Sequence, residues 1–72
     1  MSISDRLIEL KETRKHLQKD IASAVGVSLR SYQRYEHGER KPDADTLIAL
    51  ADYFDVSVDY LLARTDNPEI NK

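Results

Sequence analysis

The chain of 72 residues contains no cysteine and only two glycines. Without cysteine, it has no disulfides, thiolate metal sites or cysteine nucleophiles, which fits a reducing cytosol. Two glycines leave no glycine-rich loop that could cradle a phosphate. The two histidines, His16 and His37, have no carboxylate or nucleophile at a recognisable catalytic spacing. We therefore expect neither an enzyme nor a cofactor site. We also expect no metal site, because the acidic residues are scattered along the chain.

Long apolar runs are missing as well. The first residues carry charge at Asp5 and Arg6 and lead into no apolar stretch. We therefore expect neither a signal peptide nor a membrane span, and we expect a cytoplasmic location.

A chain of this length forms one small domain that buries only about 60% of its unfolded surface. A second copy would add to its stability.

Charge is divided unevenly along the chain. The net charge of −2 argues against a nonspecific nucleic-acid binder, which is usually strongly basic. Residues 1–42 hold nine Lys/Arg against six Asp/Glu, a balance of +3, whereas residues 43–72 hold two against seven, a balance of −5. The basic part could meet phosphates while the acidic part discourages binding at random sites. Taken alone, such asymmetry also arises by chance in small acidic proteins.

The apolar spacing predicts an all-α fold, a compact domain of five helices, because no stretch alternates with a period of two over more than a few residues. The predicted helices cover about 4–14, 18–25, 29–37, a segment after Pro42 and a short segment after Ser57. The predicted N-caps outside the central helices are Ser4, then Asp43 or Asp45, then Ser57. The side chains expected to face the core from the first, fourth and fifth helices are Ile3, Leu7, Leu10, Leu47, Ile48, Leu50, Ala51, Phe54, Leu61 and Leu62. Residues 1–63 form the predicted domain and residues 64–72 a flexible tail.

Residues 18–37 carry the most informative pattern. Ile21 and Val25 lie four apart and share one face of a helix. Gly26 follows at the position where a left-handed residue ends a helix without steric cost. Ser28 then suits the N-cap of the next helix, because its hydroxyl can accept a hydrogen bond from a free amide. This order predicts two short helices joined by a tight turn.

In the second of these helices, Tyr32 and Tyr35 fall three apart and can face inward. The side chains left facing outward are Leu29, Arg30, Gln33 and Arg34. Two short helices with a polar outer face of this kind indicate a helix-turn-helix that binds DNA.

The chain resembles the lambda-repressor-like helix-turn-helix proteins, also called the Cro/phage-repressor or XRE type. Besides the motif, the resemblance rests on residues 34–38 (Arg-Tyr-Glu-His-Gly) and on residues 46–62, which are close to the family's usual ending. It covers about residues 3–62. It implies a DNA-binding domain whose second motif helix enters the major groove.

Base reading is expected from the outer face of residues 29–37. Arg30 and Arg34 lie four apart, so both can enter a major groove about 12 Å wide and pair with guanine. Gln33 could pair with adenine, and Leu29 could touch a thymine methyl. On an isolated helix the two arginines would be ordinary solvated surface, but the motif favours contact with bases or phosphates.

Other residues are candidates for phosphate contacts, which position a protein without reading sequence. They are Gln18, Lys19, Ser28, Ser31, Arg40 and Lys41. In the family, the glutamine at the position of Gln18 binds the DNA backbone and sometimes supports a reading side chain; a plain helix-start glutamine is the alternative. Lys11 and Glu36 match a family pair that we interpret as structural.

Four positions depart from the family pattern. His16 and Leu17 stand where Leu-Thr is usual, so the hydroxyl N-cap of the first motif helix is missing. Tyr32 replaces a smaller core residue, and its phenol needs a partner if buried; the alternative is that it leans to the surface and touches a phosphate. His37 replaces an asparagine and is expected to supply a helix-end cation or a backbone bond.

A candidate dimer surface comprises Tyr53, Val58 and Tyr60, although these residues could equally cover the core. The family generally dimerises through its C-terminal helices. The predicted function is a dimeric, sequence-specific transcriptional regulator, a repressor, that meets half-sites about 34 Å apart on a palindromic double-stranded operator. The alternative is an antitoxin or adaptor that acts through protein contacts, for which the tyrosines and the tail matter more than the arginines.

Overall fold

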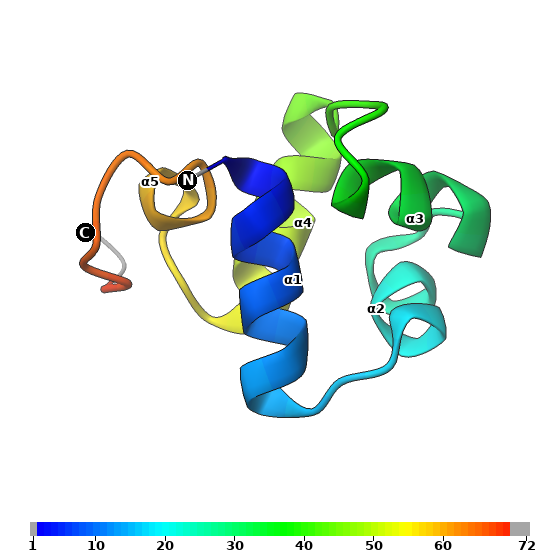
Figure 1. Cartoon of the computed structure of the whole chain (residues 1–72), viewed down its shortest axis with the longest axis horizontal. Helices are drawn as coiled ribbons and strands as arrows, with labels where there is room; N and C mark the ends of the chain where they lie inside the picture. Colours follow the sequence, from blue (N-terminus) through cyan, green and yellow to red (C-terminus); the bar gives the residue numbers. More distant parts are fainter. Residues whose placement is uncertain (1, 70–72) are drawn as a thin grey trace.

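The computed structural model describes residues 2–69, which contain five α-helices and no strand (Figure 1). The helices are α1 (Ile3–Arg14), α2 (Gln18–Val25), α3 (Leu29–Glu36), α4 (Ala44–Phe54) and α5 (Val58–Leu61). The predicted all-α, five-helix fold is confirmed, and so are the bounds of α2. Helix α3 ends at Glu36 with His37 as its C-cap, one residue earlier than predicted.

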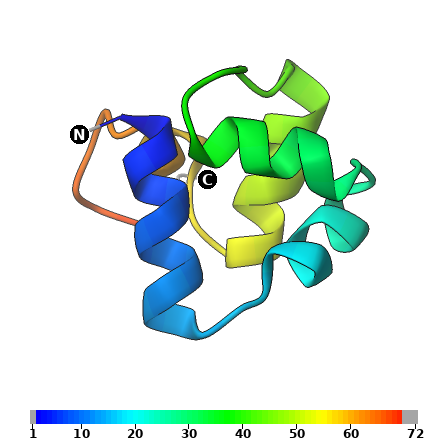
Figure 2. The same cartoon turned by 45° about the vertical axis from the view of Figure 1, so that its right-hand side comes forward.

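Helix α1 stands between the α2–α3 pair on one side and α5 on the other, with α4 behind it (Figure 1). It packs against α3 and α5, while α4 packs against α2 and α5. Figure 2 shows α3 with α2 below it and the α3–α4 loop above it. The largest fully buried side chains are contributed by all five helices and the α4–α5 turn: Leu7, Ile21, Tyr32, Leu50, Phe54, Val56 and Leu61.

The helix starts follow capping chemistry. Ser2 is the N-cap of α1: its hydroxyl accepts the N–H of Asp5, while the Asp5 carboxylate accepts the N–H of Ser2. The prediction of Ser4 as N-cap is therefore wrong; the Ser4 hydroxyl instead donates to the backbone carbonyl of Glu36 at 3.0 Å and ties α1 to the end of α3. Asp43 caps α4, and its bond from the Thr46 N–H holds the pKa of Asp43 below its usual value.

Two predicted core residues are on the surface. Ile48 is 51% exposed and Leu62 is 37% exposed. The buried stripe of α4 runs through Leu50, Ala51 and Phe54, and Ile48 lies outside it because the apolar face of this helix is narrower than its sequence suggests. Leu62 follows the last residue of α5 and turns away from the core, whereas Leu61 is fully buried.

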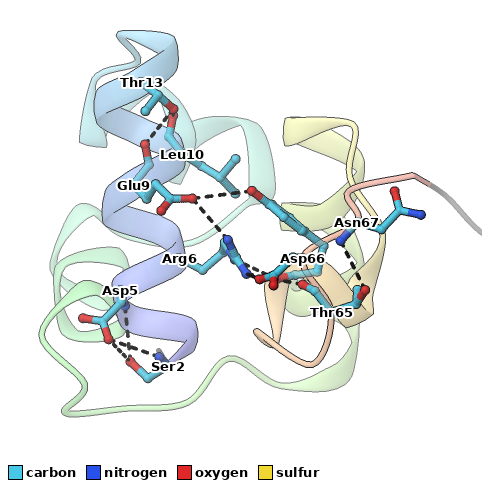
Figure 3. A network of polar contacts seen from close by, with 10 residues as sticks. Ser2, Asp5, Arg6, Glu9, Leu10, Thr13, Thr65, Asp66 and Asn67 are labelled. Atoms are coloured by element: carbon cyan, nitrogen blue, oxygen red, sulfur yellow. Dashed lines mark hydrogen bonds and ion pairs between the residues drawn. The ribbon is translucent and has the colours of Figure 1, made fainter.

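The segment that follows α5 is held on α1 by Arg6 (Figure 3). The buried Arg6 guanidinium donates from Nε to the carbonyl of Tyr60 at 2.9 Å and from Nη2 to the carbonyl of Thr65 at 3.3 Å, and it lies 3.8 Å from the centre of the Tyr60 ring. Further along, the N–H of Ser57 donates to the carbonyl of Pro68 at 2.9 Å. Flexibility of the tail stays a prediction, and residues 70–72 lie outside the described residues.

Candidate nucleic-acid interface

Helices α2 and α3 form the predicted motif around a glycine turn. Gly26 has a φ of +77° and ends α2, and the hydroxyl of Ser28 accepts the N–H of Ser31 at 3.0 Å to begin α3. Ile21 from α2 and Tyr32 from α3 are both fully buried. The inner faces of both helices are thus fixed in the core, which leaves the outer face of α3 for a partner.

The four residues predicted to read bases are all at least partly accessible. Leu29 is 43% exposed and Arg30 is exposed, whereas Gln33 and Arg34 are half-buried. At 43% exposure, Leu29 has part of its apolar side chain accessible to an external surface.

The candidate phosphate-binding residues belong to the start of α2, the start of α3 and the loop after α3. Lys19, Ser28, Arg40 and Lys41 are exposed, and Gln18 and Ser31 are half-buried. The Ser28 hydroxyl donates to the Ser31 hydroxyl at 3.0 Å, in addition to its capping bond. The contacts of all six residues with DNA stay predictions.

Beneath the outer face of α3 lies a polar network centred on Glu36. Lys11 of α1 donates to Oε1 of Glu36 at 2.9 Å, and Gln18 Nε2 donates to the same oxygen at 3.1 Å. Gln33 Nε2 in turn donates to Gln18 Oε1 at 3.2 Å. Glu36 is only 5% exposed. The network therefore joins the expected structural pair to one expected phosphate contact and one expected base contact.

The charge state of this network follows from its donors. Burial alone would raise the pKa of Glu36, but the hydrogen bonds from Lys11 and Gln18, together with the nearby Tyr32 phenol, outweigh burial and lower it, so the carboxylate is ionised at neutral pH. Burial and the neighbouring Glu36 raise the pKa of Tyr32, which keeps its phenol protonated.

Tyr32 is fully buried, so the expectation that it leans to the surface and touches a phosphate is wrong. Its hydroxyl and Oε2 of Glu36 make no hydrogen bond of normal geometry. The phenol is nevertheless close enough to the carboxylate for each group to shift the pKa of the other. The core accommodates the larger ring, and the buried carboxylate is the polar neighbour of its hydroxyl.

The structure confirms that the start of α2 has no hydroxyl N-cap. Leu17 is the N-cap of α2 without a side-chain capping bond, and it is 57% exposed. His16 turns inward, where its Nδ1 lies 2.9 Å from the Tyr53 hydroxyl and its ring packs edge-on against Phe54. An open hollow of about 490 Å³ lies around the start of α2; it is lined by Lys11, His16, Leu17, Gln18, Lys19 and Leu29. Leu17 and Leu29 therefore line the same hollow. The sequence did not indicate Leu17 as a surface residue, because an apolar residue is ordinarily expected in the core.

The candidate dimer surface is half-buried. Tyr53, Val58 and Tyr60 pack against the core. Tyr53 contacts His16, and the Arg6 guanidinium lies over the Tyr60 ring. Each tyrosine therefore has an intramolecular role, Tyr53 with His16 and Tyr60 with Arg6, and their part in a dimer stays a prediction.

The family model for helix-turn-helix domains matches residues 7–61, most of the chain. The chain belongs to the lambda-repressor-like helix-turn-helix family. This confirms the resemblance inferred from the motif, and it is a non-enzymatic, DNA-binding family, as expected.

Relatives of this helix-turn-helix chain are transcriptional regulators. The chain is 41% identical over 64 residues to the uncharacterised regulator YobD of Bacillus subtilis, covering 89% of this chain and 57% of YobD. It is 36% identical over 64 residues to the cryptic phage CTXphi transcriptional repressor RstR of Vibrio cholerae, again covering 89% of this chain and 57% of that protein. The chain thus spans little more than half the length of these curated relatives.

A solved structure with the same helix-turn-helix fold is the P22 c2 repressor in complex with a synthetic operator. The two superpose with a TM-score of 0.82 at 29% identity, covering 86% of this chain and 94% of that chain. A transcriptional regulator from Listeria innocua matches with a TM-score of 0.82 at 35% identity, covering 86% of this chain and 58% of that chain.

Within the described part of the chain, no helix is long and apolar enough to cross a membrane. Residues 2–69 likewise contain no cluster of three or more His, Asp or Glu side chains that could hold a metal ion.

Proposed function

We propose that this chain is the DNA-binding part of a cytoplasmic transcriptional repressor that binds a palindromic double-stranded operator as a dimer, with α3 in the major groove. The observation that carries the proposal is the outer face of α3, where Leu29 and Arg30 are exposed on a helix whose inner face is locked in the core. Arg30 and Arg34 each supply the paired donors that guanine accepts. The similarity to a phage repressor and to an operator-bound repressor supports this direction.

The proposed phosphate contacts flank this helix. Lys19 at the start of α2, Ser28 at the start of α3 and the exposed pair Arg40 and Lys41 after α3 would hold the helix in the groove. Gln18 opens α2, where free backbone amides favour an anion. The balance of −5 over residues 43–72 would weaken binding at random sites and so favour specific ones.

Selection of bound sites from a random DNA pool tests the proposal. Wild type, the double variant Arg30→Ala/Arg34→Ala and the control Arg64→Ala are compared at two salt concentrations; Arg64 is exposed and far along the chain from the motif. We expect wild type and the control to select one palindromic site, with affinity falling as salt rises. The affinity of the double variant for that site should be lower by roughly tenfold or more. Failure of wild type to enrich any sequence overturns the proposal.

A second candidate is an adaptor or antitoxin that acts through a protein partner. The observation that favours it is the apolar surface left by Ile48 and Leu62, and Leu62 also lines a hollow of about 300 Å³ together with Ile3, Pro42 and Leu47. Exposed apolar side chains beside a mainly apolar hollow are typical of protein contacts. This surface also suits the second copy in a repressor dimer, so sedimentation of the chain alone and with operator DNA separates the two roles.

A further inference from the structure

Four large apolar side chains are exposed in the part of the chain that the structure describes, and two of them stand at the starts of the motif helices. Leu17, the N-cap of α2, is 57% exposed, and Leu29, the first residue of α3, is 43% exposed. Both line the open hollow at the start of α2. A single exposed leucine needs no explanation, whereas two that share one hollow offer an apolar surface to a ligand.

Leu17 contributes little to its own helix. A side-chain oxygen at an N-cap accepts a hydrogen bond from a free amide of the first turn, and Leu17 makes no such bond. Since it is 57% exposed, it also buries less apolar area than a core leucine. The threonine that is usual at this position in the family would cap the helix. The chain therefore gives up a capping bond and gains an exposed apolar side chain beside two candidate DNA contacts, Gln18 and Lys19.

The chemistry of the hollow matches one feature of DNA. Its lining combines the two leucines with Lys19, which is exposed and forms no ion pair within residues 2–69. The base edges of the major groove offer one kind of apolar group, the C5-methyl of thymine, and the backbone beside them carries phosphates. Leucines and a free cation in one hollow therefore suit a thymine methyl group next to a phosphate.

We propose that Leu17 is a specificity-determining residue that holds the methyl group of one thymine against Leu29 in this hollow. The inference rests on the proposed function, because it requires the starts of α2 and α3 to face DNA. It goes beyond the contact expected of Leu29 alone, since both motif helices then select the same base. The hollow recognises the methyl group itself, so it distinguishes thymine from uracil although both pair with adenine.

Deoxyuridine in place of thymine removes this methyl group and leaves the base pair unchanged. Dissociation constants are measured for the site that wild type selects and for copies of it in which a single thymine is replaced by deoxyuridine. At one position we expect wild type to bind the uracil duplex roughly fourfold less tightly, which is the effect of leaving one methyl group unburied. In Leu17→Ala and in Leu29→Ala the ratio at that same position should fall below about twofold.

The matched control is Lys19→Ala, because Lys19 lines the same hollow. It should weaken the thymine and uracil duplexes by the same factor and so retain the fourfold ratio. Leu17→Met keeps an apolar side chain of similar size and should retain the ratio too. The unfolding midpoint of each variant should stay near that of wild type, because all of the substituted side chains are exposed.

Three results overturn the inference and leave the proposed function intact, since a site is still selected. The first is a loss of affinity in Leu17→Ala that is equal for thymine and uracil duplexes, which would mean that Leu17 contacts the sugar-phosphate backbone. The second is a ratio that is lost in Leu29→Ala but kept in Leu17→Ala. The third is a wild-type ratio below about twofold at every thymine. A wild type that selects no site overturns both the inference and the proposed function.

Discussion

Replacing Lys11 with methionine should destabilise the domain and reverse its response to mild acid. Lys11 lies 2.9 Å from a Glu36 oxygen, and the two side chains are 19% and 4% exposed. Methionine keeps most of the buried stem of lysine but removes the only cation bonded to Glu36 in residues 2–69. The buried carboxylate then keeps the hydrogen bond from the Gln18 amide but has no charged donor.

The magnitude follows from the burial of the pair. Removing one partner of a fully buried ion pair costs about 3–5 kcal/mol, because the other charge is left without compensation. Lys11 is partly solvated and Gln18 still donates, so we expect about 2–3 kcal/mol at pH 7. For a domain of this size that loss lowers the midpoint of thermal unfolding by on the order of 10–20 °C.

The pH dependence tests the cause. In wild type the folded pKa of Glu36 is lowered, so its contribution is complete above the unfolded value of about 4.3 and is lost only as pH falls through the folded pKa. Without Lys11, only Gln18 and Tyr32 are left to oppose burial, which is the largest single influence on this carboxyl, so we expect the folded pKa to rise above the unfolded one. The variant therefore gains stability relative to wild type as pH falls from 7 to 5, because Glu36 takes up a proton in the folded state.

Urea unfolding followed by circular dichroism at pH 7 and pH 5 measures both effects. The matched control is Lys41→Met, since Lys41 is exposed and forms no ion pair within residues 2–69. The reasoning fails if Lys11→Met stays within about 0.5 kcal/mol of the control at pH 7. It also fails if the gap between variant and wild type widens toward pH 5.

Three further predictions concern the fold. Leu50→Ala should cost about 2–5 kcal/mol because Leu50 is fully buried, whereas Ile48→Ala should stay within about 0.5 kcal/mol, and equal losses in urea unfolding would contradict the assigned face of α4. Gly26→Ala should lower stability by about 1–2 kcal/mol at the φ of +77°, although a Cβ there meets nothing within 4 Å; an unchanged unfolding midpoint would be inconsistent with that backbone. Arg6→Met should release the segment 64–69, seen as faster cleavage after Arg64 by trypsin under native conditions, and unchanged cleavage would show that the segment is held by other contacts.

The motif was predictable because its signals are local. Gly26 and Ser28 define the turn through backbone conformation and capping, and these depend on neighbouring residues only. The start of α1 was misplaced since Ser2 and Ser4 are both good caps, and the deciding partner is the Asp5 side chain. The face of α4 was overestimated because Ile48 is apolar yet lies beside the stripe that α2 and α5 cover.

The polar network centred on Glu36 could not be predicted from the sequence. Gln18 and Glu36 are 18 residues apart, and their contact depends on how α2 and α3 cross. The burial of Tyr32 depended in the same way on the space left by the surrounding helices. The sequence identified Lys11 and Glu36 as a pair only through the family resemblance, whereas the structure shows that the pair also anchors Gln33. Capping and periodicity predict single helices, whereas a side-chain network depends on how those helices are arranged in space.

The outer face of α3 divides into residues that are free to change and one that is not. Leu29 and Arg30 are exposed and make no side-chain hydrogen bond within residues 2–69. Under the proposed function, substitutions at these two positions alter the preferred DNA sequence without disturbing the core. Gln33 is coupled through Gln18 to a buried ion pair, so a change there also alters the surroundings of Glu36. We expect lineages that diverge from this protein to switch operators first at positions 29 and 30, and at position 33 only together with position 18.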